Sequence, residues 1–397
     1  MTRTTHWMLL SLAALQFTGC VPAAAPVWVA DSQSFLYTKA DGSVVQYNLN
    51  NGSSRQLVAT SPYMPANVAI SPNQEVVATA IAEWHEGSRA VGLHFHNLQT
   101  GEELAFRNQI WGTGESSLRK PTPSSVYCSP DGKRLLICYL APTGYWGNFA
   151  VYEVNADKLT ELKTTSPSVL LTSLINCSPF LPDSSGFLAV SLRENGMHFS
   201  VVDWDGWETA IELSDDLKRA IPIGGDKEAR EIKFEAIYPL PKGKWNGNVL
   251  EFRLQSRLVQ LDTKKKTASL VSLPDAMKVD LERVAEKGAE NLTWKSYQVE
   301  KFAEGPYEIW CRFNPNTDHA RIEQVDTRDE RRRSLIEGKL QGSPPSRPLT
   351  PAPDGKHILV SLLQENAEVI HVIRHDGKIV ATLPVGERGF GPKNQKQ

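Results

Sequence analysis

The sequence predicts an all-β protein, a β-propeller of about seven four-stranded blades, with six as the alternative count and a short helical insertion between blades. The first observation is a repeat. The segment CSPDGKRLLI at 128–137 returns as APDGKHILV at 352–360, and weaker copies begin at Ser71 and Leu181. Copies spaced by roughly 40 to 60 residues have a period typical of propeller blades. The second observation is the make-up of one copy, and the third is a recurring turn.

The best-defined copy, residues 124–163, has the composition of four strands. A short strand at 125–128 precedes the turn Pro130-Asp131-Gly132, where proline presets φ and glycine accepts a positive φ. Strands then follow at 134–140, 149–154 and 159–162. The strand at 134–140 is almost continuously apolar, which indicates a sheet covered on both faces by neighbouring sheets.

The turn between the third and fourth strands carries an apolar residue followed by Asp or Asn. Short polar side chains of this kind bond their own backbone in turns. The pairs are Leu49-Asn50, Val154-Asn155, Val202-Asp203, Leu261-Asp262 and Val325-Asp326. Together with the strand pattern they predict blades at 26–58, 68–106, 124–163, 175–213, 231–273, 292–337 and 348–384. The fifth and sixth copies lack the Pro-Asp-Gly turn and are assigned from spacing.

Two segments between blades have helical character. Met277, Leu281 and Val284 recur at helical spacing within 275–291, and Asp275 can cap that helix. A shorter helix is expected to start at 214–218. We therefore expect one propeller domain at 27–385, followed by a disordered tail at 386–397.

The segments SPDGK at 129–133 and APDGK at 352–356 resemble the repeat of TolB-like propellers, which are relatives of the WD-repeat family. The Trp-Asp dipeptide typical of WD repeats occurs just once in the expected region, at Trp204-Asp205, and this rarity favours the TolB-like branch. The resemblance implies a propeller fold over most of the chain. Propellers serve many activities, so it implies no single function.

The N-terminus predicts export. Arg3 and His6 precede an apolar stretch at 7–17 that is too short to span a bilayer, so we expect a signal peptide at 1–19. The stretch ends in FTGC, which resembles the lipobox of bacterial lipoproteins and implies lipidation of Cys20, with a linker at 20–26. The alternatives are a soluble periplasmic or secreted protein and an uncleaved anchor. The lipid anchor is the membrane contact that we expect.

Composition narrows the function classes. The chain has 397 residues and a formal net charge of −2, which argues against a nucleic-acid partner. The basic runs at 264–266 and 331–333 are interpreted as solvated edges. Cys128, Cys138, Cys177 and Cys311 are interpreted as buried thiols without zinc spacing. We expect a monomer.

Signatures of catalysis and cofactors are missing from the sequence. It contains no G-x-S-x-G elbow, Walker loop or dinucleotide fingerprint, so we expect no catalytic residue and no cofactor. His94 and His96 share one side of a strand, the geometry of two metal ligands. They are interpreted as polar residues on an exposed strand face, because no carboxylate lies at a matching position on that strand, and no metal is expected.

The candidate binding face consists of loops. Connections from second to third strands and between blades are expected on one face of the ring, opposite the Pro-Asp-Gly turns. Exposed aromatic and Arg side chains on such loops are typical of recognition sites. The candidates are Trp84, His85, Trp111, Tyr145, Trp146, Arg193, Asn195, Asp318 and His319.

The sequence therefore predicts a non-catalytic protein-interaction module. It is expected to be exported, lipid-anchored on the periplasmic side of a bacterial membrane, and bound to an envelope protein. The alternative is a propeller enzyme or a small-molecule or glycan binder that uses polar groups around the central channel. Convergent polar side chains at one mouth of the channel would favour this alternative.

Overall fold

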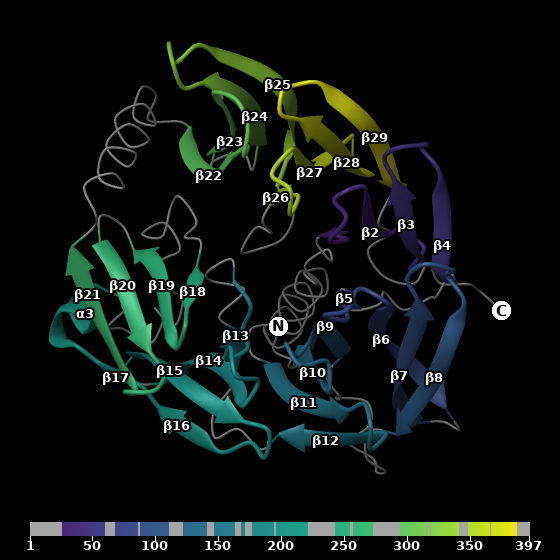
Figure 1. Cartoon of the computed structure of the whole chain (residues 1–397), viewed down its shortest axis with the longest axis vertical. Coiled ribbons are helices and arrows are strands. Elements are labelled where there is room, and N and C mark those ends of the chain that lie inside the picture. The colour runs from purple at the N-terminus through teal and green to yellow at the C-terminus, as the bar shows by residue number, and fades with distance from the viewer. Residues whose placement is uncertain are drawn as a thin grey trace, which may run out of the picture.

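The computed structural model shows small antiparallel sheets arranged as a ring, with the chain passing round the ring in order (Figure 1). It describes residues 26–59, 68–85, 88–110, 122–140, 147–162, 168–170, 177–193, 196–220, 243–254, 257–272, 294–314, 317, 319–340, 348–365 and 367–386. The predicted signal peptide, Cys20, the helix expected at 275–291 and the tail expected at 386–397 lie outside these residues, except for Gly386, which ends a strand. The described strands form seven four-stranded groups, which confirms the predicted propeller of about seven blades.

Blades 1 to 4 follow one another from the N-terminal side. The bounds of their strands are β1 (Val27–Trp28), β2 (Ser34–Thr38), β3 (Val44–Asn48) and β4 (Ser54–Val58); β5 (Ala69–Ile70), β6 (Val76–His85), β7 (Ser88–Asn97) and β8 (Glu103–Ile110); β9 (Thr122–Cys128), β10 (Arg134–Leu140), β11 (Gly147–Glu153) and β12 (Lys158–Leu162); and β13 (Ser168–Leu170), β14 (Gly186–Arg193), β15 (Gly196–Asp203) and β16 (Glu208–Ala210). The fourth blade thus begins at Ser168, earlier than the predicted 175, because β13 pairs with β14 before the turn.

Blades 5 to 7 complete the ring. Their strands are β18 (Lys244–Asn246), β19 (Val249–Leu254), β20 (Arg257–Asp262) and β21 (Thr267–Ser272); β22 (Lys295–Lys301), β23 (Tyr307–Asn314), β24 (His319–Asp326) and β25 (Arg332–Lys339); and β26 (Leu349–Pro351), β27 (His357–Gln364), β28 (Ala367–Arg374) and β29 (Ile379–Gly386). Blade 5 has an additional strand, β17 (Glu212–Leu213), which runs parallel to β21. The short helix α3 (Asp215–Ala220) follows it and confirms the helix expected at 214–218.

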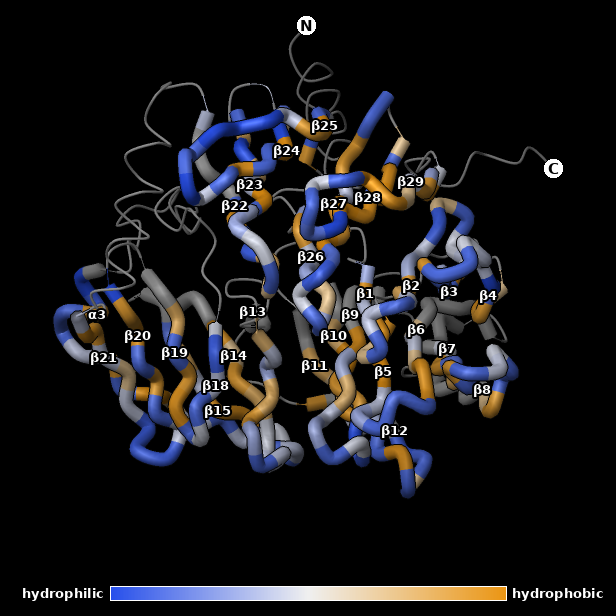
Figure 2. The backbone as a smooth tube through the Cα atoms, turned by 45° about the horizontal axis from the view of Figure 1, so that its top comes forward, coloured by the Kyte–Doolittle hydropathy of each residue, from blue (hydrophilic) through white to orange (hydrophobic). Residues whose placement is uncertain are grey.

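Apolar side chains fill the spaces between neighbouring sheets, because each inner sheet is covered on both faces. Phe149 of blade 3 and Phe187 of blade 4 are fully buried and meet edge to face, with ring centroids 5.0 Å apart. The backbone coloured by hydropathy shows apolar strand interiors and hydrophilic turns at the blade ends (Figure 2). The chain order of the blades is thus held by packing from one sheet to the next.

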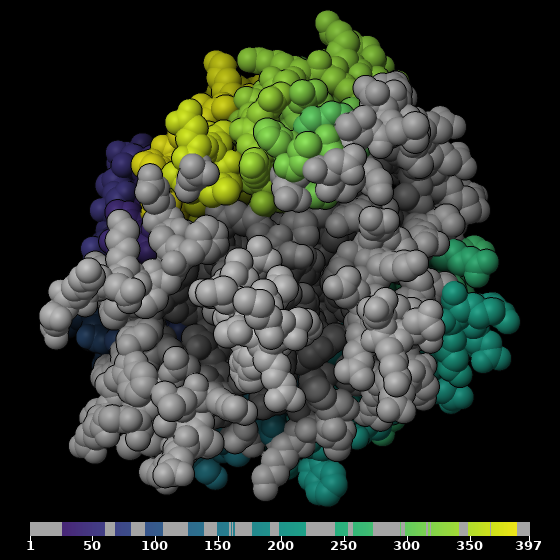
Figure 3. Space-filling view, turned by 180° about the vertical axis from the view of Figure 1, so that it is seen from behind, coloured from purple at the N-terminus to yellow at the C-terminus, as the bar shows by residue number. Residues whose placement is uncertain are grey.

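The ring closes between blade 7 and blade 1 without a shared strand, because β1 to β4 and β26 to β29 form separate sheets. The two ends of the described chain lie side by side in both views of the ring (Figures 1 and 3). Trp28 is buried in this seam, and its Nε1 donates a 2.9 Å hydrogen bond to the Thr350 carbonyl. Ser32 Oγ accepts a second bond from the Asp354 backbone N–H at 3.0 Å. Apolar contacts and a few polar bonds therefore close the ring.

Each blade turns twice through a residue with positive φ. The turns between first and second strands use Ser32, Gln74, Gly132, Ser184, Gly247, Gly305 and Gly355. The turns between third and fourth strands use Gly52, Gly101, Asp157, Gly206, Lys266, Glu330 and Gly377. The Pro-Asp-Gly turn is therefore one version of a backbone geometry that the other blades build with different residues.

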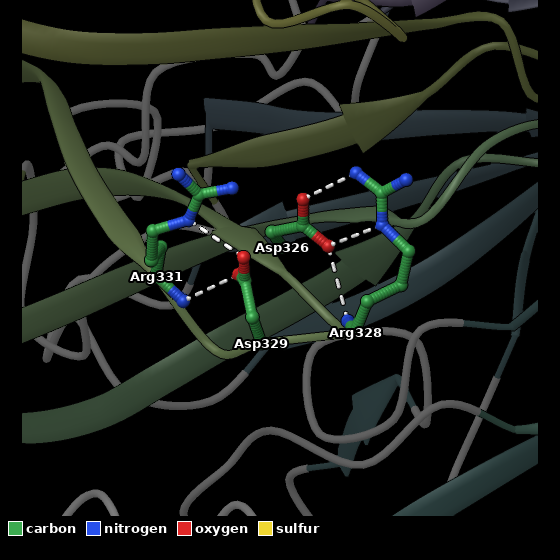
Figure 4. A network of polar contacts seen from close by, with 4 residues as sticks. All are labelled: Asp326, Arg328, Asp329 and Arg331. Atoms are coloured by element: carbon green, nitrogen blue, oxygen red, sulfur yellow. Dashed lines mark hydrogen bonds and ion pairs between the residues drawn. The ribbon is translucent and has the colours of Figure 1, made fainter.

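The predicted carboxylate turn is confirmed in blades 4, 5 and 6. Asp203, Asp262 and Asp326 each accept hydrogen bonds from backbone N–H groups two to four residues later. Asp326 also binds the Arg328 guanidinium through both carboxylate oxygens, next to a second pair, Asp329 and Arg331 (Figure 4). In blade 1 the prediction was off by two residues, because Asn48 rather than Asn50 accepts these bonds.

Candidate binding face

The two faces of the ring carry different connections. Strand direction alternates from the first to the fourth strand of each blade and every blade has the same strand order, so all second strands end, and all third strands begin, on one face. We call this the hairpin face. The turns between first and second and between third and fourth strands lie on the opposite side, the turn face. The predicted separation of the loops from the Pro-Asp-Gly turns follows from this topology.

Four of the predicted binding residues lie on described strands at the hairpin face. Trp84 and His85 end β6, with His85 opposite Ser88. Arg193 ends β14 opposite Gly196, and His319 begins β24 opposite Asn314. The described backbone therefore places parts of blades 2, 4 and 6 on the hairpin face, and the side chain of His319 is exposed there.

Other candidates fall outside the described residues. These are Trp111, which follows β8; Tyr145 and Trp146, between β10 and β11; Asn195, between β14 and β15; and Asp318, next to His319. For Trp84, His85 and Arg193 the structure describes the backbone position alone. The expected aromatic surface thus stays a prediction from the sequence at these positions.

Polar side chains on the first strand of blade 6 have structural partners. Gln298 is buried and joins blades 6 and 7, since its Nε2 donates to the Leu349 carbonyl at 2.8 Å and its Oε1 accepts from the Leu349 N–H at 3.1 Å. The same Nε2 donates to the Glu300 carboxylate at 2.9 Å. Buried polar groups bonded in this way hold neighbouring strands in register.

The buried Glu308 lies on the neighbouring strand, β23, and is also bonded. Trp310 Nε1 donates to its Oε2 at 2.9 Å, and Lys301 Nζ lies 3.3 Å from its Oε1. Arg332 covers the Trp310 ring, 5.2 Å from its centroid. Packing and charge compensation by these contacts account for the burial of the Glu308 carboxylate, so no catalytic role is needed to explain it.

The turn face displays an aromatic residue that sequence reasoning did not single out. Trp207, in the turn between β15 and β16, is 76% exposed. Its neighbour Trp204, by contrast, packs inward and donates from Nε1 to the Ser184 carbonyl at 2.7 Å, with Arg134 over its ring. Its exposure could have been predicted from its position in an outer turn, because no neighbouring sheet covers a side chain there. The Trp-Asp dipeptide therefore contributes to packing.

A groove of about 350 Å³ lies between blades 2 and 3. Residues lining it include Ala69, Phe95, Asp131 and Leu135, together with Cys128. Burial raises the pKa of the Cys128 thiol to about 11, and the Asp131 charge adds to this effect. The thiol is therefore protonated at neutral pH, which makes it a poor nucleophile or metal ligand. Cys138 and Cys311 are buried, as predicted, whereas Cys128 and Cys177 are only partly buried.

The histidine pair differs from its sequence interpretation. His94 is 17% exposed and His96 is 4% exposed, so the pair does not lie on an open strand face as expected. A carboxylate does accompany them, contributed by the neighbouring strand β8: Glu103 Oε1 lies 3.3 Å from His94 Nδ1. Among the described residues this trio is the group whose side chains could together hold a metal ion.

In the described part of the chain, no helix is long and apolar enough to cross a membrane. No protein-family model matches the chain, and no curated protein matches it.

Three solved structures illustrate the range of proteins that have a similar fold. One is the dihydro-heme d1 dehydrogenase NirN, at 15% identity over 92% of this chain, with a TM-score of 0.45. The second is TolB from Acinetobacter baumannii, at 10% identity over 88% of this chain, with a TM-score of 0.37. The chain spans 66% of the length of NirN and 63% of that of TolB. The third is the Myceliophteria thermophila Cps50 (Swd1) β-propeller domain, at 10% identity over 89% of this chain and 97% of that chain, with a TM-score of 0.48.

Proposed function

We propose that this protein is a non-catalytic interaction module of the bacterial cell envelope. It is exported, anchored through lipidated Cys20, and binds an envelope protein with the hairpin face of its propeller. The observation that carries the proposal is the common placement of the hairpins of blades 2, 4 and 6 on one face of a packed ring. Rigid scaffolds that present loops in this way are well suited to protein recognition.

The residues at these hairpins have the chemistry of interface anchors. Trp and Arg are enriched among residues that dominate binding energy, since they bury a large area and keep a polar group for orientation. Trp84 and Arg193 end their strands at this face, and His319 is exposed there. Two buried carboxylates of blade 6, in contrast, have structural partners: Glu300 is bonded to Gln298, and Glu308 to Trp310 and Lys301. This difference favours binding over catalysis.

A face-specific crosslinking experiment tests the proposal. A photoreactive amino acid is placed at His319 on the hairpin face and, as the matched control, at Lys265 on the turn face. Lys265 is 78% exposed, so both probes reach solvent. We expect one envelope protein to crosslink in stoichiometric amounts through position 319 and not through position 265. Tryptic peptides of the adduct identify the partner.

The anchor is tested with Cys20→Ala in the same cells. The proposal expects the wild-type protein to fractionate with membranes and to carry acyl chains, and the variant to lose both properties and the crosslink through position 319. Recovery of the protein alone from the His319 probe, or adducts through Lys265 only, would overturn the hairpin face as the partner site. Crosslinking that persists in Cys20→Ala would separate recognition from anchoring.

A further inference from the structure

We propose that His94, His96 and Glu103 form a binding site for a divalent transition metal, with Zn²⁺ as the preferred ion, on the outer strands of blade 2. The site is independent of the partner surface proposed above, since it does not involve the hairpin tips. It also revises the interpretation from sequence, which found two imidazoles on one strand and no acid to accompany them.

A β-bulge brings the acid to the histidines. β7 and β8 pair regularly up to Phe95 opposite Ala105, but the register then shifts, and His96 faces Glu103 instead of Leu104. Directly opposed residues in an antiparallel pair point to the same side of the sheet. The bulge therefore turns the Glu103 carboxylate toward the histidine side, and leaves Leu104 52% exposed. Re-aiming a side chain is a common result of a bulge.

The three ligand atoms already lie close together. One ligand atom from each residue lies within 4.8 Å of the other two. His94 Nδ1 is 3.3 Å from Glu103 Oε1, and the two imidazole rings are nearly parallel, with centroids 6.4 Å apart. Ligands bound at about 2.0–2.1 Å in a tetrahedron are separated by roughly 3.3 Å. A small rotation of the partly exposed His94 and Glu103 side chains is enough to reach this spacing.

His96 supplies the independent evidence for a ligand. Its side chain is 4% exposed, and although the Gly101 backbone lies close to the ring, neither ring nitrogen makes a hydrogen bond of good geometry. A buried polar group without a partner is costly, and most such groups in proteins are satisfied by protein, water or an ion. A metal ion in contact with His94 and Glu103 would bind one of these nitrogens. The strand position of His96 would then be explained by coordination.

The ligand set selects the ion. Two imidazole nitrogens and one carboxylate oxygen are a common donor set for Zn²⁺, which takes a fourth ligand from solvent, whereas Ca²⁺ and Mg²⁺ prefer sites made of oxygen. Glu103 is 50% exposed, so one side of the site opens to solvent. An ion here would link β7 to β8, since the two histidines belong to one strand and the acid to the other.

The test measures binding of Zn²⁺ alone to the purified, metal-stripped chain by titration calorimetry, with Co²⁺ absorption as a report on geometry. We expect one equivalent to bind, with visible bands of a four-coordinate Co²⁺ site. Glu103→Gln and His94→Gln should each weaken binding by about tenfold or more, since even outer-shell partners of metal sites contribute that much. Both residues are partly exposed, so these variants should fold.

Glu102→Gln is the matched control, because Glu102 is the exposed neighbour of Glu103 and its change removes the same charge. It should bind Zn²⁺ as tightly as the wild type. A Zn²⁺-dependent rise in the melting temperature should likewise occur in the wild type and Glu102→Gln, and be lost in His94→Gln. Absence of saturable binding by the wild type, or equal affinities of Glu102→Gln, Glu103→Gln and His94→Gln, would overturn the proposal.

Discussion

At the scale of single residues, one short carboxylate at the end of a strand organises an entire turn. Asp326 accepts hydrogen bonds from the Arg328 N–H and Nε at 3.0 Å and from its Nη2 at 2.7 Å. A carboxylate that receives several donors, one of them a guanidinium, is stabilised in its charged form. The pKa of Asp326 falls accordingly to about 2, with the Arg328 side-chain bonds as the largest cause.

This shift predicts a pH dependence of stability. The folded-state pKa of about 2 lies below the ordinary value of 3.8, so the unfolded state takes up the proton first as the pH falls. The stabilising effect of the Asp326 charge is therefore complete above about pH 4 and is lost progressively towards pH 2. Urea unfolding of the wild type and Asp326→Asn should give midpoints that differ at pH 6 and converge towards pH 2.

Arg328→Gln provides the comparison, because it removes the guanidinium and leaves the carboxylate in place. Its midpoint should also lie below that of the wild type at pH 6 and approach it at low pH. A constant difference between wild type and Asp326→Asn over this range would show that the charge of Asp326 does not stabilise the fold.

At the scale of elements, the turn between first and second strands explains why the repeat is hard to see in the sequence. The N–H of the positive-φ residue donates to the carbonyl three residues earlier in blades 1, 2, 3, 4 and 7. Among these five blades, glycine occupies this position in blades 3 and 7, and Ser32, Gln74 and Ser184 occupy it in blades 1, 2 and 4. A left-handed backbone costs a residue with a Cβ about 1–2 kcal/mol. The backbone geometry is thus better preserved than the residue that suits it.

Replacing serine by glycine at this position should raise the free energy of unfolding, and replacing glycine by alanine should lower it. Ser184→Gly relieves the left-handed strain, offset by glycine's greater freedom in the unfolded chain of about 0.5–1 kcal/mol, so the free energy of unfolding should rise by about 0.5 kcal/mol. Gly132→Ala should lower it by about 1–2 kcal/mol. Its new Cβ would meet Pro72 at 3.5 Å, an ordinary contact, so backbone strain is the sole cost.

Urea unfolding at neutral pH measures both changes. A loss of stability in Ser184→Gly would mean that its side chain supports the turn, and an unchanged Gly132→Ala would contradict the strain argument. The slopes of the unfolding free energy against urea concentration, compared along with the midpoints, test whether both variants expose the same surface on unfolding.

The same elements show how far sequence reasoning reached. Continuous apolar runs and turn residues were enough to place the blades, because strands buried on both faces need apolar side chains throughout. The early start at Ser168 and the parallel strand at Glu212 and Leu213 were not predictable, because both depend on pairing with distant segments. The turn built on Ser32 was not recognised because it lacks glycine, whereas the turns built on Gln74 and Ser184 were recognised as weaker copies of the repeat.

The candidate sites divide in a similar way. Alternation along a strand placed His94 and His96 on the same side, but their acid, Glu103, became visible only through the bulge between β7 and β8. A bulge leaves little trace in sequence. The positions of Trp84, Arg193 and His319 at one face followed from strand order alone, because this depends on topology and not on side-chain packing.

At the scale of the whole molecule, the seam between blades 7 and 1 makes the ring one unit. The Trp28 hydrogen bond to Thr350 joins residues 322 positions apart. Trp28 also meets Phe35 edge to face at 5.4 Å and lies against His357 of blade 7. Because no strand is shared, side-chain packing has to supply much of the closing energy.

Trp28→Ala should therefore weaken the entire ring. Loss of a buried Trp side chain costs about 3–5 kcal/mol, and we expect one cooperative unfolding transition at lower urea concentration. Phe149→Ala, at the junction of blades 3 and 4, is the matched control, with a cost in the same range. Circular dichroism and Trp fluorescence should report the same midpoint in each variant. Two separate transitions in Trp28→Ala alone would mean that the terminal blades unfold independently.

The seam also delays the completion of folding during synthesis, because it joins the first and last blades. At a synthesis rate of roughly 5–20 residues per second, the 322 residues between Trp28 and Thr350 take about 16 to 64 s to emerge. During that time the apolar side of blade 1, with Phe35, Tyr37 and Val45, has no seventh blade to cover it. A chain with this apolar surface exposed can bind chaperones, and its ring cannot close until blade 7 has been synthesised. The export proposed above would use such a delay, because a chain threaded through a membrane has to cross it before it folds.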